Sequence, residues 1–351
     1  MKKALISGIT GQDGAYLARF LLDNNYKVFG MYRRSSTPNF WRLQSLDIFN
    51  QILFIPSDIT DTGSIMEAIT IAEPDEIYNL AAQSFVGASF EQARFSTDVN
   101  GLGPVRFLEA IRLMNNNIKF YQASTSEMYG NSTDGKILLN EESRMSPISP
   151  YAASKLYGFH STQIYRQAYN IFASNGILFN HESPLRGLEF VTRKVSNIVA
   201  KIALGLEKEL VLGNLEAKRD WGYAPEYVEA MWLILQQETP ADYVIASGES
   251  HSVRELVDSA FKVVGINDYG KYLNLDPRFE RPLDINVLIG DPTLAMNELK
   301  WQPKTKFKDL IEIMVNSDYS KWERCIKGET FPWDAPNYPS EANIISRSMK
   351  L

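Results

Sequence analysis

Residues 3–14 read KALISGITGQDG, and the expected fold follows from them. A short apolar run leads directly into glycines at positions 8, 11 and 14. This order predicts a buried strand, a tight turn and the start of a helix, because glycine lets the backbone turn sharply and approach a neighbouring group closely. The free N–H groups of the helix start would attract a phosphate. The spacing is G-x-x-G-x-x-G, and tight packing of the strand on the helix would also explain it.

The rest of the chain alternates between strand-like and helix-like patterns. Strands are expected at 3–7, 27–32, 52–56, 76–80, 118–124 and 171–178, and helices at 14–24, 62–72, 95–114 and 150–168. This alternation predicts an α/β fold with a Rossmann-type doubly wound parallel sheet. Later helices, expected at 195–205, 226–237, 253–264 and 307–321, lie among longer loops and predict a smaller C-terminal α/β substrate domain.

The predicted domain limits follow from this change of pattern. Residues 1–178, with a return segment near 215–245, would form the nucleotide-binding domain. Residues 179–214 and 246–325 would form the substrate domain, and 326–351 a peripheral tail.

Composition narrows the class of protein. The chain has 351 residues, of which 44% are hydrophobic, and a net charge of −6, which argues against general binding to nucleic acid. Its single cysteine, Cys325, excludes an internal disulfide framework and predicts a reducing, cytoplasmic location. No apolar run approaches the roughly 20 residues that span a bilayer, so no membrane contact is expected. No cluster has metal-ligand spacing, so no catalytic metal is expected.

A dinucleotide site is predicted at the ends of the first four strands. The turn residues Gly8, Thr10, Gly11, Gln12, Asp13 and Gly14 would hold a pyrophosphate. The second strand ends in Arg33, Arg34, Ser35 and Ser36 rather than in the acid that selects NAD, which favours the 2′-phosphate of NADP; a solvated surface pair of arginines is the alternative. Asp58 and Ile59 would flank the adenine, and the cofactor would pass Leu80, Ala81, Ala82, Gln83 and Ser84.

Two further segments carry residues suited to catalysis. Ser149 and Pro150 are good starting residues for a helix, which places Tyr151 and Lys155 one turn apart on one face. The ammonium would lower the tyrosine pKa and let Tyr151 act as a base, although an amphipathic face would look the same. Thr125 and Glu127 follow the fifth strand, where α/β sheets place their chemistry; Glu127 could instead be only an acid at a helix start.

These segments resemble the extended short-chain dehydrogenase/reductase superfamily, and within it the GDP-mannose 4,6-dehydratase family. The resemblance covers roughly residues 1–325. It is carried by the glycine turn, by NLAAQSFVGAS (79–89), QASTSEMYG (122–130), NHESPLRG (180–187), FVTRK (190–194) and LGNLEAKRDWG (212–222), and by YAASK (151–155).

The resemblance implies roles for individual residues. Tyr151 and Lys155 would be the catalytic pair, Thr125 would bind the sugar 4-hydroxyl, and Glu127 would be the acid/base of dehydration. His181 and Arg186 would contact NADP, although His181 could also be purely structural. Asn180, Lys194, Arg219 and Arg281 would surround the nucleotide diphosphate. The residue types support this diphosphate site in part, because a diphosphate needs basic partners. The acidic chain provides a basic set: Arg186, Arg193, Lys194, Arg219 and Arg281.

The implied activity is dehydration of a GDP-sugar to its 4-keto-6-deoxy form, in a homodimer or homotetramer. Two departures leave the sugar open: the segment between Glu127 and Tyr151 is longer than in the family, and Phe95 stands where a tyrosine contact to the cofactor is expected. A GDP-heptose is therefore an alternative substrate. A 4-keto reductase or epimerase is disfavoured by Glu127, and a non-catalytic NADP-binding protein by the presence of Tyr151 and Lys155.

Overall fold

The largest layer of the computed structural model, which describes residues 1–36, 39–131, 138–277, 283, 285 and 287–329, is a parallel sheet. Its seven strands lie in the order β3-β2-β1-β4-β5-β6-β11. They are β1 (Lys3–Ser7), β2 (Lys27–Tyr32), β3 (Leu53–Pro56), β4 (Glu76–Asn79), β5 (Lys119–Thr125), β6 (Ala173–Leu178) and β11 (Tyr243–Ile245). The order reverses between β1 and β4, and in such sheets the crevice beyond the carboxyl ends at this point binds ligands.

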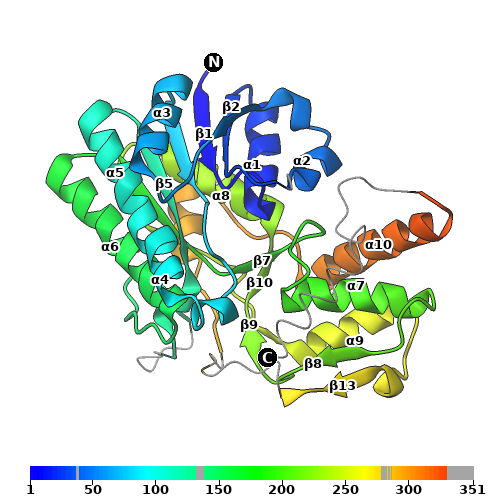
Figure 1. Cartoon of the computed structure of the whole chain (residues 1–351). Coiled ribbons are helices and arrows are strands. Elements are labelled where there is room, and N and C mark those ends of the chain that lie inside the picture. Colours follow the sequence, from blue (N-terminus) through cyan, green and yellow to red (C-terminus); the bar gives the residue numbers. More distant parts are fainter. Residues whose placement is uncertain (37–38, 132–137, 278–282, 284, 286, 330–351) are drawn as a thin grey trace.

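Helices cover both faces of this sheet (Figure 1). On one face α1 (Gln12–Asp23) packs on α8 (Ala224–Gln236), and on the other lie α3 (Thr62–Ala72), α5 (Gly103–Met114) and α6 (Pro150–Tyr169). Strand β1 shows the cause, because alternate side chains point to opposite faces: Ala4 and Ile6 enter the core beneath α1, and Leu5 enters the core beneath α3. Burial on both faces explains the unbroken apolar run at positions 4–6.

A smaller layer has its own apolar core. It contains α7 (Val191–Ala203), α9 (Val253–Val263), α10 (Phe307–Ile326), β8 (Leu210–Leu212) and β13 (Leu273–Leu275). Between the layers β7 (Asn180–Glu182) pairs with β10 (Trp221–Tyr223), and β9 (Lys218–Arg219) pairs with β12 (His251–Ser252). The chain then returns through α8 and β11 to the large sheet. The domain limits expected from the sequence stay a prediction.

The shorter elements lie mostly in the connections. They are α2 (Trp41–Ser45), α4 (Ala93–Ser96), the π-helix η7 (Ala295–Leu299) and the 3₁₀ turns η1 (Phe49–Gln51), η2 (Gly87–Ser89), η4 (Ser126–Tyr129) and η5 (Gly270–Tyr272). Among the helices described, none is long and apolar enough to cross a membrane.

The predicted fold class is confirmed. The helix expected at 95–114 is present but irregular: α4 is followed by a π-helical turn, η3 (Thr97–Leu102), and then by α5. Helix α6 packs closely on this turn, since a Cβ on Gly158 would lie only 3.0 Å from the Asn100 carbonyl oxygen. The last helix continues past the expected end at 321 to Ile326. The predicted tail beyond residue 329 lies outside the described residues.

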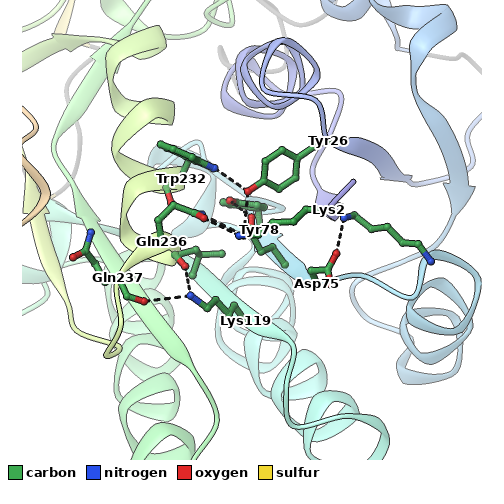
Figure 2. Close-up of polar contacts among 11 residues, drawn as sticks. Lys2, Tyr26, Asp75, Tyr78, Lys119, Trp232, Gln236 and Gln237 are labelled. Atoms are coloured by element: carbon green, nitrogen blue, oxygen red, sulfur yellow. Dashed lines mark hydrogen bonds and ion pairs between the residues drawn. The ribbon is translucent and has the colours of Figure 1, made fainter.

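A buried polar cluster joins α8 to the amino ends of the strands (Figure 2). The carboxylate of Glu76, 1% exposed, accepts hydrogen bonds from Tyr78 at 2.8 Å and Tyr26 at 3.2 Å. It also accepts from Lys2 Nζ at 2.9 Å and Gln236 Nε2 at 3.2 Å. Four donors satisfy the buried charge, so this cluster can hold the helix on the sheet without an uncompensated ion. It lies at the opposite end of the strands from the predicted site.

Candidate functional site

The glycine turn is built as the sequence predicts. Gly8 has φ of +72°, and a Cβ there would lie 2.8 Å from the Ala81 backbone nitrogen. A Cβ on Gly14 would lie 2.3 Å from the Gly8 carbonyl oxygen. The turn closes through a 2.9 Å bond from Gly11 N to Gly8 O, and α1 starts at Gln12. Side chains at these positions would force the strand, turn and helix apart.

A cavity of about 430 Å³ opens beyond the carboxyl ends of β1–β4. Most of the predicted cofactor residues line it: Gly8, Thr10, Gly11, Gln12, Asp13, Gly14, Arg33, Asp58, Ile59, Leu80, Ala81, Ala82, Gln83, Ser84 and Arg186. Arg34, Ser35 and Ser36 are exposed and are not part of its wall, so their contact with a cofactor stays a prediction. The concave shape, a positive helix end and a guanidinium at the end of β2 fit a nicotinamide dinucleotide.

Several residues of the cavity wall were not predicted from the sequence. The wall also contains Ser7, Met31, Tyr32, Ser57, Thr60 and Val99. Phe95, which the sequence placed where a contact to the cofactor is expected, lines the cavity as well and is 41% exposed. Most of them are the last residues of strands or the first residues after them. Position at a strand end, rather than side-chain chemistry, was the signal that could have found them.

Arg42 of α2 is a second omission. Its guanidinium donates to the Thr10 carbonyl at 3.1 Å and to the Leu185 carbonyl at 2.7 Å. It thereby ties the glycine turn to the segment after β7. Burial lowers its pKa to about 10, although the nearby Glu189 carboxylate acts in the opposite direction. No local pattern marks a single arginine of this kind, because its two partners lie far apart in the chain.

The predicted catalytic residues gather at the carboxyl end of β5. Ser149 caps α6 by accepting from Ala152 N at 3.1 Å, as predicted, which places Tyr151 in the first turn. Thr125 shares a hydrogen bond with Tyr151 and accepts from the backbone N–H of Glu127 at 3.3 Å. Thr125 therefore joins the predicted base to the segment that carries the predicted acid.

Gly130 closes this segment against the loop before α6. It has φ of +59°, and a Cβ there would lie 1.9 Å from the Ser146 carbonyl oxygen. Only glycine fits this combination of left-handed backbone and close approach. The loop that contains Ser146 therefore rests directly on the segment that carries Thr125 and Glu127.

The electrostatics of Tyr151 and Lys155 differ from the expectation. Burial, together with the Glu127 charge, raises the pKa of Tyr151 to about 12, against the hydrogen bond from Thr125, so the predicted lowering by Lys155 is wrong for this structure. Lys155 Nζ instead donates to the Ala123 carbonyl at 2.9 Å. Burial lowers the pKa of Lys155 to about 8, while the charge of Asp13 acts to raise it.

Of the two residues expected to contact NADP, Arg186 lines the cavity and His181 lies behind its wall. His181, 8% exposed, does not line the cavity, and its ring nitrogens face the Phe179 carbonyl and the Asp13 carboxylate. Arg186 does line it, with its guanidinium 3.5 Å from the centre of the Phe190 ring and Nε 3.1 Å from Glu182. A direct contact of His181 with the cofactor stays a prediction.

The basic set expected around a diphosphate is only partly available. Arg193 is wrong as a member, because it is 4% exposed and forms a 2.5 Å ion pair with Asp318 of α10. Arg219 donates to the Lys218 and Ile285 carbonyls at 2.9 and 2.7 Å. Lys194 is partly buried, and this burial lowers its pKa although Asp276 acts to raise it. Asn180 begins β7, and Arg281 lies outside the described residues.

Within the described part of the chain, no group of three or more His, Cys, Asp or Glu side chains is placed to hold a metal ion.

Known proteins match this chain over nearly its whole length. The sequence model of a family described as GDP-mannose 4,6 dehydratase matches residues 5–314. The chain belongs to the GDP-mannose 4,6-dehydratase family. The Drosophila melanogaster GDP-mannose 4,6 dehydratase is 46% identical, with 90% of this chain and 86% of that protein covered. The Homo sapiens protein is also 46% identical, with 90% and 91% covered.

Solved structures support the fold of a GDP-mannose 4,6-dehydratase family member. The Thermus thermophilus UDP-glucose 4-epimerase, solved in complex with NAD, has a TM-score of 0.78 and 25% identity. The match covers 91% of this chain and 99% of that one.

Proposed function

We propose that this protein is an NADP-dependent hydro-lyase that converts GDP-mannose to GDP-4-keto-6-deoxymannose and water. The observation that carries the proposal is the placement of a buried carboxylate, Glu127, next to the hydrogen-bonded Thr125 and Tyr151 in a chain 46% identical to GDP-mannose 4,6-dehydratases. A reductase or an epimerase needs the tyrosine but has no use for an acid/base at that point.

NADP is the cofactor that the cavity residues favour. Arg33 directly follows β2 on the cavity wall, and no acid is present there to bind a ribose 2′-hydroxyl. A guanidinium can hold a 2′-phosphate through two parallel hydrogen bonds. When bound, NADP supplies the chemistry of taking a hydride from the sugar C4 and later returning one to C6.

The chain's own residues move the protons. Tyr151, once ionised, takes the proton of the C4 hydroxyl, and the hydrogen bond from Thr125 stabilises its phenolate. The resulting ketone makes the C5 hydrogen acidic. Glu127 removes that proton and protonates the C6 hydroxyl, so that the C6–O bond breaks and water leaves. A proton returned to C5 completes a reaction with no net redox change.

Mass spectrometry of the product tests this function. The full chain is incubated with GDP-mannose and NADP⁺ and without a reductant. We expect a product lighter by one water. Glu127→Gln should bind NADP⁺ normally and lose about 100-fold or more in rate, as expected for loss of a general acid/base, while the exposed Glu142→Gln serves as the matched control. Water loss at a near wild-type rate in Glu127→Gln would remove its assigned role, and turnover of a GDP-heptose but not of GDP-mannose would change the substrate.

Binding measurements test the choice of cofactor. Arg33→Ala should weaken NADP⁺ binding about tenfold to 100-fold, since hydrogen bonds to a charged group contribute about 1.5–3 kcal/mol, and should hardly affect NAD⁺. Arg34→Ala, which changes an exposed neighbour off the cavity wall, should have a smaller effect. Equal losses for the two cofactors in Arg33→Ala would contradict a contact with the 2′-phosphate.

A further inference from the structure

His181 and Asp13 form a buried pair directly behind the glycine turn. His181 Nε2 lies 2.9 Å from Asp13 Oδ2, and Nδ1 lies 2.8 Å from the Phe179 carbonyl oxygen. The ring stacks on Tyr227 of α8, with the ring centres 4.6 Å apart. The histidine is therefore fixed in orientation and faces an oxygen at each nitrogen.

The hydrogen bonds around the pair define how many protons it holds. A carbonyl only accepts, so Nδ1 carries a hydrogen. The Gln12 amide is oriented in the same way, because its Nε2 lies 3.1 Å from the His181 carbonyl and its Oε1 accepts from Ser183 at 2.7 Å. This Nε2 also donates to Asp13 Oδ1 at 3.0 Å. The other carboxylate oxygen, Asp13 Oδ2, faces His181 Nε2. One proton shared between these two atoms makes the pair neutral overall.

Asp13 occupies a position where its charge matters. It lies in the first turn of α1 and lines the cavity, next to the N–H groups that would bind the cofactor diphosphate. Without the shared proton the pair would carry a full negative charge beside an anionic ligand. With the proton, the positive end of the helix remains available to that ligand.

The Asp13 carboxylate keeps the proton on His181 against the repulsion of nearby cations. The guanidiniums of Arg42 and Arg186 are the cations that act on Asp13. Glu182 and the phenols of Tyr121, Tyr151 and Tyr227 are the other titratable groups nearby, with the ammonium of Lys155. Burial is the largest single influence and would raise the Asp13 pKa, but the His181 charge, the hydrogen bonds from His181 and Gln12 and the Arg186 charge together lower it to about 2. Burial would lower the His181 pKa, and the Asp13 charge and hydrogen bond reverse this, so the pKa is raised.

We propose that His181 is a positioning residue that acts through Asp13: it carries the proton that neutralises this carboxylate, so that the glycine turn can bind the anionic diphosphate of the cofactor. The inference rests on the proposed use of a dinucleotide. It assigns to the histidine a role that does not need a contact with the ligand.

The test is a cycle of variants measured by NADP⁺ binding to the full chain. His181→Gln keeps a donor toward Asp13 but removes the proton, and should raise Kd about tenfold at pH 7, the effect of one unit charge within about 10 Å at the effective dielectric constant of a protein. Asp13 itself lines the cavity, so Asp13→Asn serves as the reference for the second arm of the cycle and not as an unchanged control. In that background the added His181→Gln change should raise Kd less than about threefold, because no carboxylate is left to neutralise. A merely structural histidine predicts the same loss from His181→Gln in both backgrounds.

The pH dependence gives a second readout that needs only well-folded proteins. Because the His181 pKa is raised, the pair keeps its shared proton at the pH values where a free imidazole would lose it. The wild-type Kd for NADP⁺ should therefore be constant over that pH range and should rise as pH passes the pKa of the pair. Asp13→Asn should show no such rise. Coinciding pH profiles of wild type and Asp13→Asn, or an equal loss from His181→Gln in both backgrounds, would overturn the inference while wild-type binding upholds the proposed function. Absence of NADP⁺ and NAD⁺ binding to the wild type would overturn both.

Discussion

Replacing Asp318 with asparagine removes the carboxylate that neutralises Arg193 between α7 and α10. The two side chains are 0% and 5% exposed, and their charged atoms lie 2.5 Å apart. Asp318 also accepts a 2.7 Å hydrogen bond from Ser196, which an amide oxygen can keep. The principal loss is therefore the charge. Breaking a buried pair from one side costs about 3–5 kcal/mol, because the remaining ion is left without compensation.

The expected effect is a large loss of stability with little loss of function. At about 2–4 °C per kcal/mol for a large domain, Tm should fall by about 6 °C or more. Well below that temperature, KM for GDP-mannose should change less than about threefold, since neither residue lines the cavity.

Thermal unfolding and steady-state kinetics check both parts of this prediction. The double variant Arg193→Met with Asp318→Leu is the control, because it removes both charges and should recover most of the stability. A Tm shift of Asp318→Asn below about 1 °C would refute the buried-pair reasoning. A folded double variant whose KM rises more than about tenfold would show that Arg193 serves the substrate after all, as the sequence suggested.

Three further predictions follow from the geometry. Gly8→Ala should weaken NADP⁺ about tenfold or more, because its Cβ would meet Ala81, whereas Gly205→Ala, with the same φ of +72° and open space around it, should leave binding unchanged; equal binding in both variants would contradict this. Glu76→Leu should cost about 2–3 kcal/mol in urea unfolding, because four donors lose their shared acceptor, with activity of the folded enzyme retained; an unchanged urea midpoint would argue against it. Thr125→Val should move the rise of kcat to higher pH, because Tyr151 must lose its proton to act and loses the bond that lowers its pKa; Thr125→Ser should not, and superimposed pH–rate profiles would disprove the role.

Local sequence was sufficient where a signal lies within one turn or one strand. The glycines of residues 8–14 predict the first turn because their conformational freedom is a property of each residue. Ser149 and Pro150 predict the start of α6 for the same reason, and helix α3 has the predicted bounds. Thr125 and Glu127 could be placed together because all parallel strands end at one edge of the sheet.

The errors arise where the outcome depends on contacts between distant segments. Arg193 belongs to a basic stretch, and only the packing of α7 on α10 puts Asp318 against it. The predicted helix 95–114 contains a π-helical turn on which α6 packs closely. Arg42 has no recognisable motif, yet it holds two backbone carbonyls together.

The sequence by itself determined the doubly wound sheet, the dinucleotide turn and the residues placed together after β5. These depend on periodicity and on the conformational range of single residues, which are local properties. Only the tertiary structure decided which charged side chains are paired inside the protein and which face the cavity. Arg193 is neutralised by Asp318, His181 lies 2.9 Å from the Asp13 carboxylate, and Arg33 and Arg186 line the cavity. Electrostatic pairing depends on distances between segments that lie far apart in the chain, and folding alone sets those distances.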